Sequence, residues 1–234
     1  MSQKNSSPEE KFIKSVVTFF LFMMLLTFLF GLTACAKEEG IVCNEKIEAS
    51  DGRPSILVIG DSISIAYMPY IQAALPAYQV VHNPCNAMNS RHTKANIDEW
   101  LRARPTWAAV TFNNALWDGA DFARVYDTEY THNITYIASA IKLKTSAPLF
   151  ILGTYVPINA PYRTDARQVM YNGLASSVMT SLSIPTVDLY SISSSNLGWY
   201  VNPALQDDVH FEAVGSQALA NEILNQLNTQ YGIN

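Results

Sequence analysis

Ser62 stands at a turn where nucleophilic chemistry is possible. It follows an apolar run, Ile56–Ile59, and the pair Gly60 and Asp61. The glycine lets the chain turn sharply out of a strand, and Ser62 then begins a helix, where free backbone N–H groups and the helix dipole favour an oxyanion. The same triplet is common as a helix cap, with Asp61 or Ser62 as the capping residue. By itself it is weak support for a nucleophile.

A histidine near the other end of the chain is the matching base. The segment Asp207-Asp208-Val209-His210 comes just before the last amphipathic helix. An aspartate three residues before a histidine, on a bent loop, can hold Nδ1 of the ring while Nε2 faces a nucleophile. Taken alone, His210 is better interpreted as a structural histidine near a helix start. Together, Ser62, Asp207 and His210 supply a nucleophile, an orienting acid and a general base.

The elements that must position these residues follow from hydrophobic periodicity. From Ser55 onward, β-rich runs alternate with segments whose apolar residues recur three and four positions apart. The predicted strands are Ile56–Ile59, Gln79–His82, Ala108–Phe112, Leu149–Leu152 and Thr186–Asp188. The predicted helices carry the apolar sets Met68/Ile71/Leu75, Ile97/Trp100/Leu101, Tyr130/Ile134/Ile137/Ile141, Met170/Leu174/Val178 and Leu219/Ile223/Leu227. This alternation predicts an α/β fold with a mainly parallel sheet, whose ligands bind beyond the carboxyl ends of the strands.

Two blocks of the chain resemble the SGNH or GDSL hydrolases. Gly60-Asp61-Ser62 followed by Ile63 resembles the nucleophile block of that family, with Ile in place of the commoner Leu, and Asp207-x-x-His210 resembles its terminal block. The resemblance runs from Ser55 to about Leu227. It implies a three-layer α/β/α sandwich with a five-stranded, flavodoxin-like sheet, and hydrolysis of acyl esters. It also implies the roles: Ser62 attacks, His210 transfers the proton, and Asp207 orients His210.

The oxyanion hole is where the sequence departs from the family pattern. Met88 falls where the family usually has a glycine that donates its N–H, and a side chain is tolerable there if the dihedral suits it. Trp117 takes the place of the usual Asn in the third block. Asn113 is the candidate for the second donor, although Asn113 and Asn114 could simply be turn residues. The resemblance therefore implies an oxyanion hole of Ser62, Asn113 and Met88.

The N-terminus predicts export and a lipid anchor. A polar segment with three lysines precedes the apolar run Val16–Ala34, and Leu32-Thr33-Ala34-Cys35 resembles the bacterial lipobox, whose cysteine is acylated. We therefore predict a lipoprotein signal peptide over residues 1–34, an acylated Cys35 with a polar tether over 35–54, and the hydrolase domain over 55–234. The alternative is an uncleaved transmembrane anchor. Either way, the domain is expected outside the cytoplasm, at the cell envelope and close to a membrane surface.

Composition narrows the remaining choices. The chain has 234 residues, enough for one core. With 49% apolar and only 15% charged residues it is predicted to be globular, and its net charge of −5 without a basic cluster gives no indication of nucleic-acid binding. No histidines stand at metal-ligand spacing, so no metal or cofactor is expected, and a monomer is the default. Cys43 and Cys85 could pair in an exported protein, or remain a linker thiol and a buried thiol.

Three functions fit these features to different degrees. The first is an exported carboxylic-ester hydrolase, acting on small acyl or O-acetyl esters, with carbohydrate esters among the candidates. The second is a catalytically weakened domain of the same family that binds glycan or envelope polymer without turnover. The third is a phosphate- or nucleotide-binding α/β domain, which would need more glycines than Gly60 alone in its first loop.

Overall fold

The computed structural model describes residues 46–234. The chain divides into two units, Met1–Val42 and Cys43–Asn234, and the described residues belong to the second. The predicted signal segment 1–34 and the predicted acylation site Cys35 lie outside the described residues.

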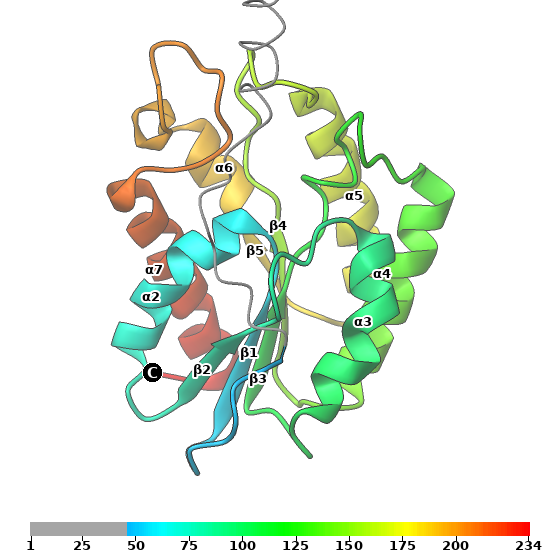
Figure 1. Cartoon of the computed structure of the whole chain (residues 1–234), viewed down its shortest axis with the longest axis vertical. Coiled ribbons are helices and arrows are strands. Elements are labelled where there is room, and N and C mark those ends of the chain that lie inside the picture. The colour runs from blue at the N-terminus through cyan, green and yellow to red at the C-terminus, as the bar shows by residue number, and fades with distance from the viewer. Residues whose placement is uncertain (1–45) are drawn as a thin grey trace, which may run out of the picture. The chain divides into compact units, whose positions relative to one another are not determined.

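Five strands form one parallel sheet (Figure 1). The strands are β1 Ser55–Ile59, β2 Gln79–His82, β3 Ala109–Phe112, β4 Pro148–Leu152 and β5 Thr186–Asp188. They lie in the order β2-β1-β3-β4-β5, and each neighbouring pair is parallel. All five predicted strands are confirmed to within one residue at each end. From β1 the chain adds β2 on one side and then β3, β4 and β5 on the other, so the strand order switches between β1 and β3. Ligands bind at such a switch point in folds of this type.

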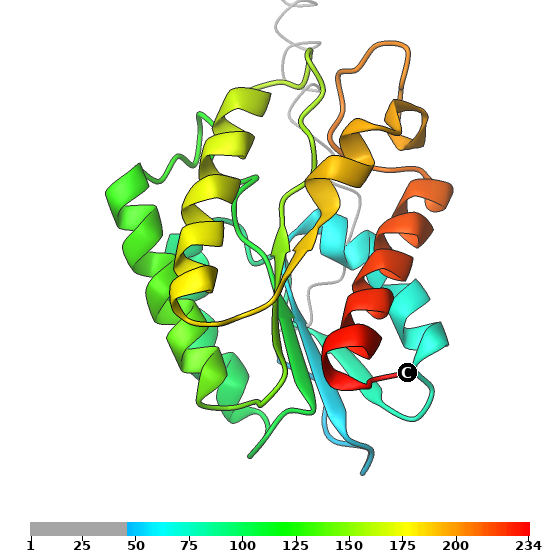
Figure 2. The same ribbon diagram turned by 180° about the vertical axis from the view of Figure 1, so that it is seen from behind.

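Helices cover both faces of the sheet (Figures 1 and 2). The helices are α2 Ser62–Ala74, α3 Ser90–Arg102, α4 Asp127–Lys142, α5 Asp165–Ser181, α6 Leu189–Ser194, the 3-10 turn η1 Leu197–Trp199 and α7 Ala213–Tyr231. Helices α2 and α7 pack together on one face, and α3, α4 and α5 lie side by side on the other. The predicted three-layer α/β/α fold is confirmed.

Strand β1 shows why the sheet needs two helical layers. Its side chains alternate, so that Ile56 and Val58 enter the core beneath α2 and α7, while Leu57 and Ile59 enter the core beneath α3, α4 and α5. All four are fully buried. A strand buried on both faces reads as a continuous apolar run, as this one does.

Helix α5 is rotated relative to the sequence prediction. Of the predicted stripe Met170/Leu174/Val178, Val178 is buried, but Met170 and Leu174 are only partly buried. The structure buries Tyr171 and Ala175 in their place. The Tyr171 ring lies edge-on to Tyr130, with centroids 4.7 Å apart, and its hydroxyl donates to the Val125 carbonyl. This large aromatic side chain fixes which face of the helix turns inward.

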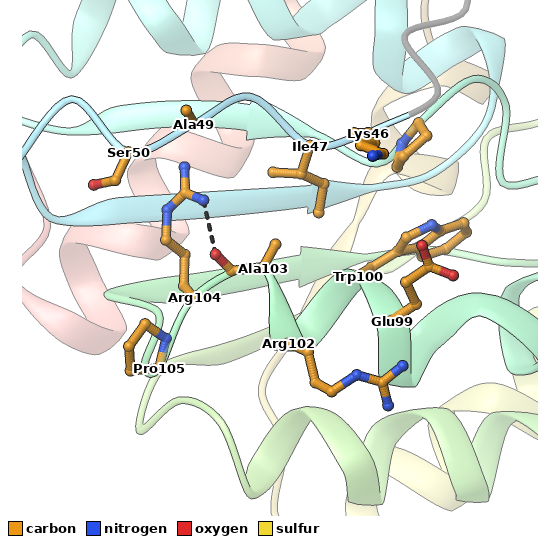
Figure 3. A pocket seen from close by; sticks show the side chains of 11 residues that line it. Lys46, Ile47, Ala49, Ser50, Glu99, Trp100, Arg102, Ala103, Arg104 and Pro105 are labelled. Atoms are coloured by element: carbon orange, nitrogen blue, oxygen red, sulfur yellow. Dashed lines mark hydrogen bonds between the residues drawn. The ribbon is translucent and has the colours of Figure 1, made fainter.

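The described part of the predicted tether is bound to the domain. The carbonyl of Glu48 accepts a hydrogen bond from Arg104, and that of Ala49 accepts one from Gln79. Ile47 packs against the core cluster beneath α3 to α5. A hollow of about 590 Å³ lies between this segment and α3 (Figure 3). Its lining does not include Ser62, so it is separate from the site described below.

Two further findings concern residues 46–234. Within residues 46–234, no helix combines the length and apolar character needed to cross a membrane. Cys85 is disulfide-bonded. Cys43, the pairing candidate named from the sequence, lies outside the described residues.

Candidate active site

Ser62 lies at the first turn of α2, directly beyond the carboxyl end of β1. Asp61 is the N-cap of this helix, and its side chain accepts a hydrogen bond of 3.0 Å from the Ile63 N–H. The capping alternative is therefore confirmed for Asp61, which leaves the Ser62 hydroxyl free for another partner. That partner is His210: Ser62 Oγ lies 2.9 Å from His210 Nε2. The two residues are 148 positions apart in the chain.

Main-chain hydrogen bonds hold the loop that carries His210 against the segment around Tyr200. The His210 carbonyl accepts a hydrogen bond of 3.0 Å from the Val201 N–H, and the Trp199 carbonyl accepts one of 2.8 Å from the Glu212 N–H. Tyr200 and Phe211 form an isolated antiparallel bridge between these two bonds. The main chain of the loop is thus fixed before α7 begins.

The carboxylate that contacts His210 is that of Asp208, which differs from the prediction of Asp207. Asp208 Oδ1 lies 2.7 Å from His210 Nδ1 and also accepts the His210 backbone N–H at 2.8 Å. The reason is local geometry. Val209 and Phe211 turn into the core, so an extended chain places Asp208 and His210 together on the outer face. Asp207 is exposed, and none of the described hydrogen bonds involves its side chain.

Two aspartates of the site differ in their electrostatics. Partial burial would raise the pKa of Asp208, but hydrogen bonds from the His210 backbone and ring outweigh it, so this pKa lies below its usual range. Burial raises the pKa of Asp61, only partly offset by the Ile63 N–H and by the charges of His210 and Arg163. The hydrogen bonds from His210 therefore favour the ionised form of Asp208, whereas burial disfavours the ionised form of Asp61.

Met88 adopts the conformation that a glycine would adopt more easily. Its φ is 52°, in the left-handed region. The Met88 N–H donates a hydrogen bond of 2.7 Å to Asn86 Oδ1. The N–H that we predicted as an oxyanion donor is therefore already hydrogen-bonded to Asn86. Asn86 itself was not predicted as a site residue.

Asn113 lies between the ends of β1 and β3. Its N–H donates to the Ile59 carbonyl at 3.1 Å, and its side chain makes no hydrogen bond within residues 46–234. A Cβ on Gly60 would lie 2.4 Å from Asn113 Oδ1 and 2.6 Å from Ser64 Oγ. Gly60 is thus needed for close approach, and not for a left-handed turn, because its φ is not positive. The Asn113 amide lies beside the turn that carries Ser62.

Asn114 has a structural task in the same region. Its side-chain amide donates to Thr93 Oγ1 at 2.9 Å and to the Met88 carbonyl at 3.3 Å. The main-chain carbonyl of Asn114 accepts a hydrogen bond from the Tyr130 hydroxyl. Asp118 has a similar task, because its Oδ1 accepts the Ser90 N–H at 2.9 Å at the start of α3. These bonds link the loops after β2 and β3.

A cluster that the sequence analysis did not assemble lies on the loops after β3 and β4. The guanidinium carbon of Arg163 lies 5.3 Å from the Phe122 ring centroid and 6.0 Å from that of Trp117. Phe122 packs edge-on against Trp117 and Tyr162. No local signal in the sequence links Trp117 to Arg163.

No metal centre is evident in this part of the chain. Among residues 46–234, no three His, Cys, Asp or Glu side chains gather as a metal site would require. The arrangement that the described residues do provide is a serine hydroxyl, an imidazole and a carboxylate in hydrogen-bonded series, which is the geometry of nucleophilic catalysis.

Comparison with known proteins places the fold. No family model matches the chain, and no curated protein matches it. An acetylxylan esterase from Geobacillus stearothermophilus superimposes with a TM-score of 0.60 and 19% identity, over 76% of this chain and 95% of its own. A lipase/acylhydrolase from Enterococcus faecalis gives 0.63 and 15%, over 76% and 96%. An α/β hydrolase from the metagenome of Lake Arreo gives 0.63 and 18%, over 76% and 95%. At these identities the likeness establishes the shared fold.

Proposed function

We propose that this protein is a serine esterase that hydrolyses carboxylic esters through an acyl-enzyme. The observation that carries the proposal is the series of contacts from Ser62 Oγ to His210 Nε2, 2.9 Å, and from His210 Nδ1 to Asp208, 2.7 Å. A carboxylate can only accept, so the Nδ1 proton faces Asp208 and Nε2 is left to accept from Ser62. This is the tautomer that a general base for serine needs.

The proposed reaction has two stages. Ser62 Oγ attacks the ester carbonyl while its proton passes to His210 Nε2, and His210 then gives that proton to the departing alcohol oxygen. Water repeats the sequence on the acyl-enzyme and releases the acid. Asp208 holds the ring and stabilises the imidazolium in both stages, in the role that the family resemblance assigned to Asp207.

The developing oxyanion needs two hydrogen-bond donors, and the N–H of Ser62 is the first of them. The Ser62 N–H is at the first position of α2, so it has no partner within the helix. The second donor in this proposal is the side-chain N–H of Asn113, whose amide makes no hydrogen bond among residues 46–234. The Met88 N–H contributes only after Asn86 releases it.

Small acyl or O-acetyl esters are the proposed substrates. Several structural neighbours are acetylxylan esterases, and another is a lipase/acylhydrolase, which supports an ester substrate with a sugar or lipid alcohol. We further propose that Cys35 is acylated and holds the domain at the cell envelope, because Leu32–Cys35 resembles a lipobox.

The test uses the full chain, kept in a mild detergent. It should hydrolyse p-nitrophenyl acetate and react with a fluorophosphonate probe. Ser62→Ala should abolish labelling and lower kcat by about 10⁶-fold, as loss of a serine nucleophile does. The matched control is Ser177→Ala on the exposed face of α5, which should retain both activities. A wild type that neither labels nor hydrolyses short esters would instead favour the glycan-binding alternative.

A further inference from the structure

Arg163 has donors that the protein does not use. An arginine side chain carries five N–H donors. Among the described residues, Arg163 makes one hydrogen bond, in which Nη1 donates to the Pro161 carbonyl at 3.5 Å. Its Nε is buried without a partner there. Arg163 belongs to none of the salt bridges found within residues 46–234. A buried donor left unsatisfied in a native fold requires an explanation.

Arg104 shows what a structural arginine looks like in this fold. Arg104 is buried, and its donors reach Ser55 Oγ and the Glu48 carbonyl. It also donates to the Ala103 carbonyl, as Figure 3 shows. Every one of its guanidinium nitrogens has a protein partner. Arg163, by contrast, is covered by aromatic faces and not by acceptors.

The position of Arg163 is built by neighbouring loops. Asp121 N–H donates to the Tyr162 carbonyl at 2.9 Å, and Asp121 also pairs with Arg167, so the loop after β3 is tied to the loop after β4. Asn159 is tied to the loop before His210, because its N–H donates to the Gln206 carbonyl at 2.9 Å. The segment that carries Arg163 is therefore tied both to the loop after β3 and to the loop before His210.

The charge of Arg163 acts on the catalytic residues without pairing with them. Asp61 and Asp208 both interact with it electrostatically. However, Asp61 is engaged by Ile63 and Asp208 by His210. Burial lowers the pKa of Arg163, and these two carboxylates offset that effect only in part.

We infer that Arg163, stacked on Trp117 and Phe122, is a subsite for an acidic group carried by the ester substrate. A guanidinium beside aromatic rings can still donate from both terminal nitrogens, and these fit a carboxylate or a phosphate monoester through two parallel hydrogen bonds. Phe122 and Tyr162 are 56% and 64% exposed. Their rings therefore offer apolar surface to the part of the substrate that carries the acidic group. This inference rests on the proposed esterase function and adds a preference for anionic esters.

The first test compares matched acetate esters. The probes are 4-acetoxybenzoate, 4-acetoxyphenyl phosphate and the neutral methyl 4-acetoxybenzoate, with the full chain in detergent. In Arg163→Gln, kcat/KM for at least one acidic ester should fall about 10- to 100-fold relative to the neutral ester, the value of hydrogen bonds to a charged group. The ratio between wild type and variant cancels the intrinsic reactivities. Arg53→Gln, which removes an exposed arginine paired with Asp51, should leave the ratio unchanged.

A second test does not depend on turnover. Binding of benzoate, phenyl phosphate and neutral benzamide is measured by calorimetry on Ser62→Ala and on the double variant Ser62→Ala/Arg163→Gln. The two anions distinguish a carboxylate from a phosphate ligand. Loss of anion binding by about tenfold or more in the double variant, with benzamide unaffected, supports the subsite. Equal anion binding by the two proteins, or an unchanged ester ratio in Arg163→Gln, overturns it. If the wild type hydrolyses no ester, the esterase proposal fails while this binding result still decides the subsite.

Discussion

Single contacts set the chemistry of His210. Its ring lies between Ser62 and Asp208, and the carboxylate determines which nitrogen carries the proton. Asp208 also accepts the His210 backbone N–H, so one side chain fixes both the main chain and the ring of the proposed base. Its neighbour Asp207 makes no such contact among the described residues, although the two differ by only one position.

The pair Asp207 and Asp208 therefore offers a sharp test. Asp208→Asn should lower kcat by roughly two to four powers of ten, because an amide can stabilise the wrong tautomer of His210 and cannot stabilise the imidazolium. Asp207→Asn should leave kcat within about twofold, since it leaves the Asp208 contact intact. Both are measured with p-nitrophenyl acetate. A larger loss in Asp207→Asn would mean that the loop bends as the family pattern implies.

At the scale of elements, the site depends on how closely β1 and β3 end beside one another. Gly60 leaves space at the end of β1 for the Asn113 side chain at the end of β3. The parallel register between these strands pairs Ile59 with Phe112, so the residues that follow emerge together. The chemistry thus sits at the point where the strand order reverses.

Gly60→Ala should disrupt this junction. Its new Cβ would lie 2.4 Å from Asn113 Oδ1, so Asn113 must move. Loss of one oxyanion donor lowers kcat by about 10²- to 10³-fold, and we expect that loss with the fold retained by circular dichroism. Gly173→Ala on α5 is the control, because its Cβ would meet nothing within 4 Å, and it should raise stability slightly. Unchanged kcat in Gly60→Ala would argue against Asn113 as a donor.

At the scale of the whole molecule, a partly buried histidine and a fully buried aspartate give opposite responses to pH. Burial lowers the pKa of His82 from 6.5 to about 4. The unfolded chain therefore binds a proton between these values that the folded protein does not, and stability falls as pH decreases through this window. Burial raises the pKa of Asp118 from 3.8 to about 6. The folded protein holds that proton, so stability increases as pH decreases from about 6 to 3.8.

Removing one group should expose the effect of the other. Relative to wild type, His82→Gln should become more stable by up to about 3 kcal/mol between pH 6.5 and pH 4, because the penalty for protonating His82 disappears. Asp118→Asn should lose more stability than wild type over the same range. Urea denaturation at pH 7, 5.5 and 4.5 gives the comparison. Parallel stability profiles for all three proteins would contradict these assignments.

The sequence by itself determined the strands and the two ends of the catalytic series. A buried parallel strand needs a short, wholly apolar run, and β1 is such a run. Because the carboxyl ends of parallel strands meet at one edge, Ser62 after β1 and His210 before α7 could be brought together by topology alone. Their contact across 148 positions agrees with that reasoning.

Only the tertiary structure decided which neighbours complete the site. Asp208 faces His210 because Val209 and Phe211 are buried on the opposite side, and burial is a property of the packed core. Arg163 meets Trp117 and Phe122 because loops from two strands converge. Periodicity within an element is written in adjacent residues, whereas contacts between loops depend on how distant elements pack. The tertiary structure therefore decides the carboxylate and the arginine, while the local sequence is enough for the serine and the histidine.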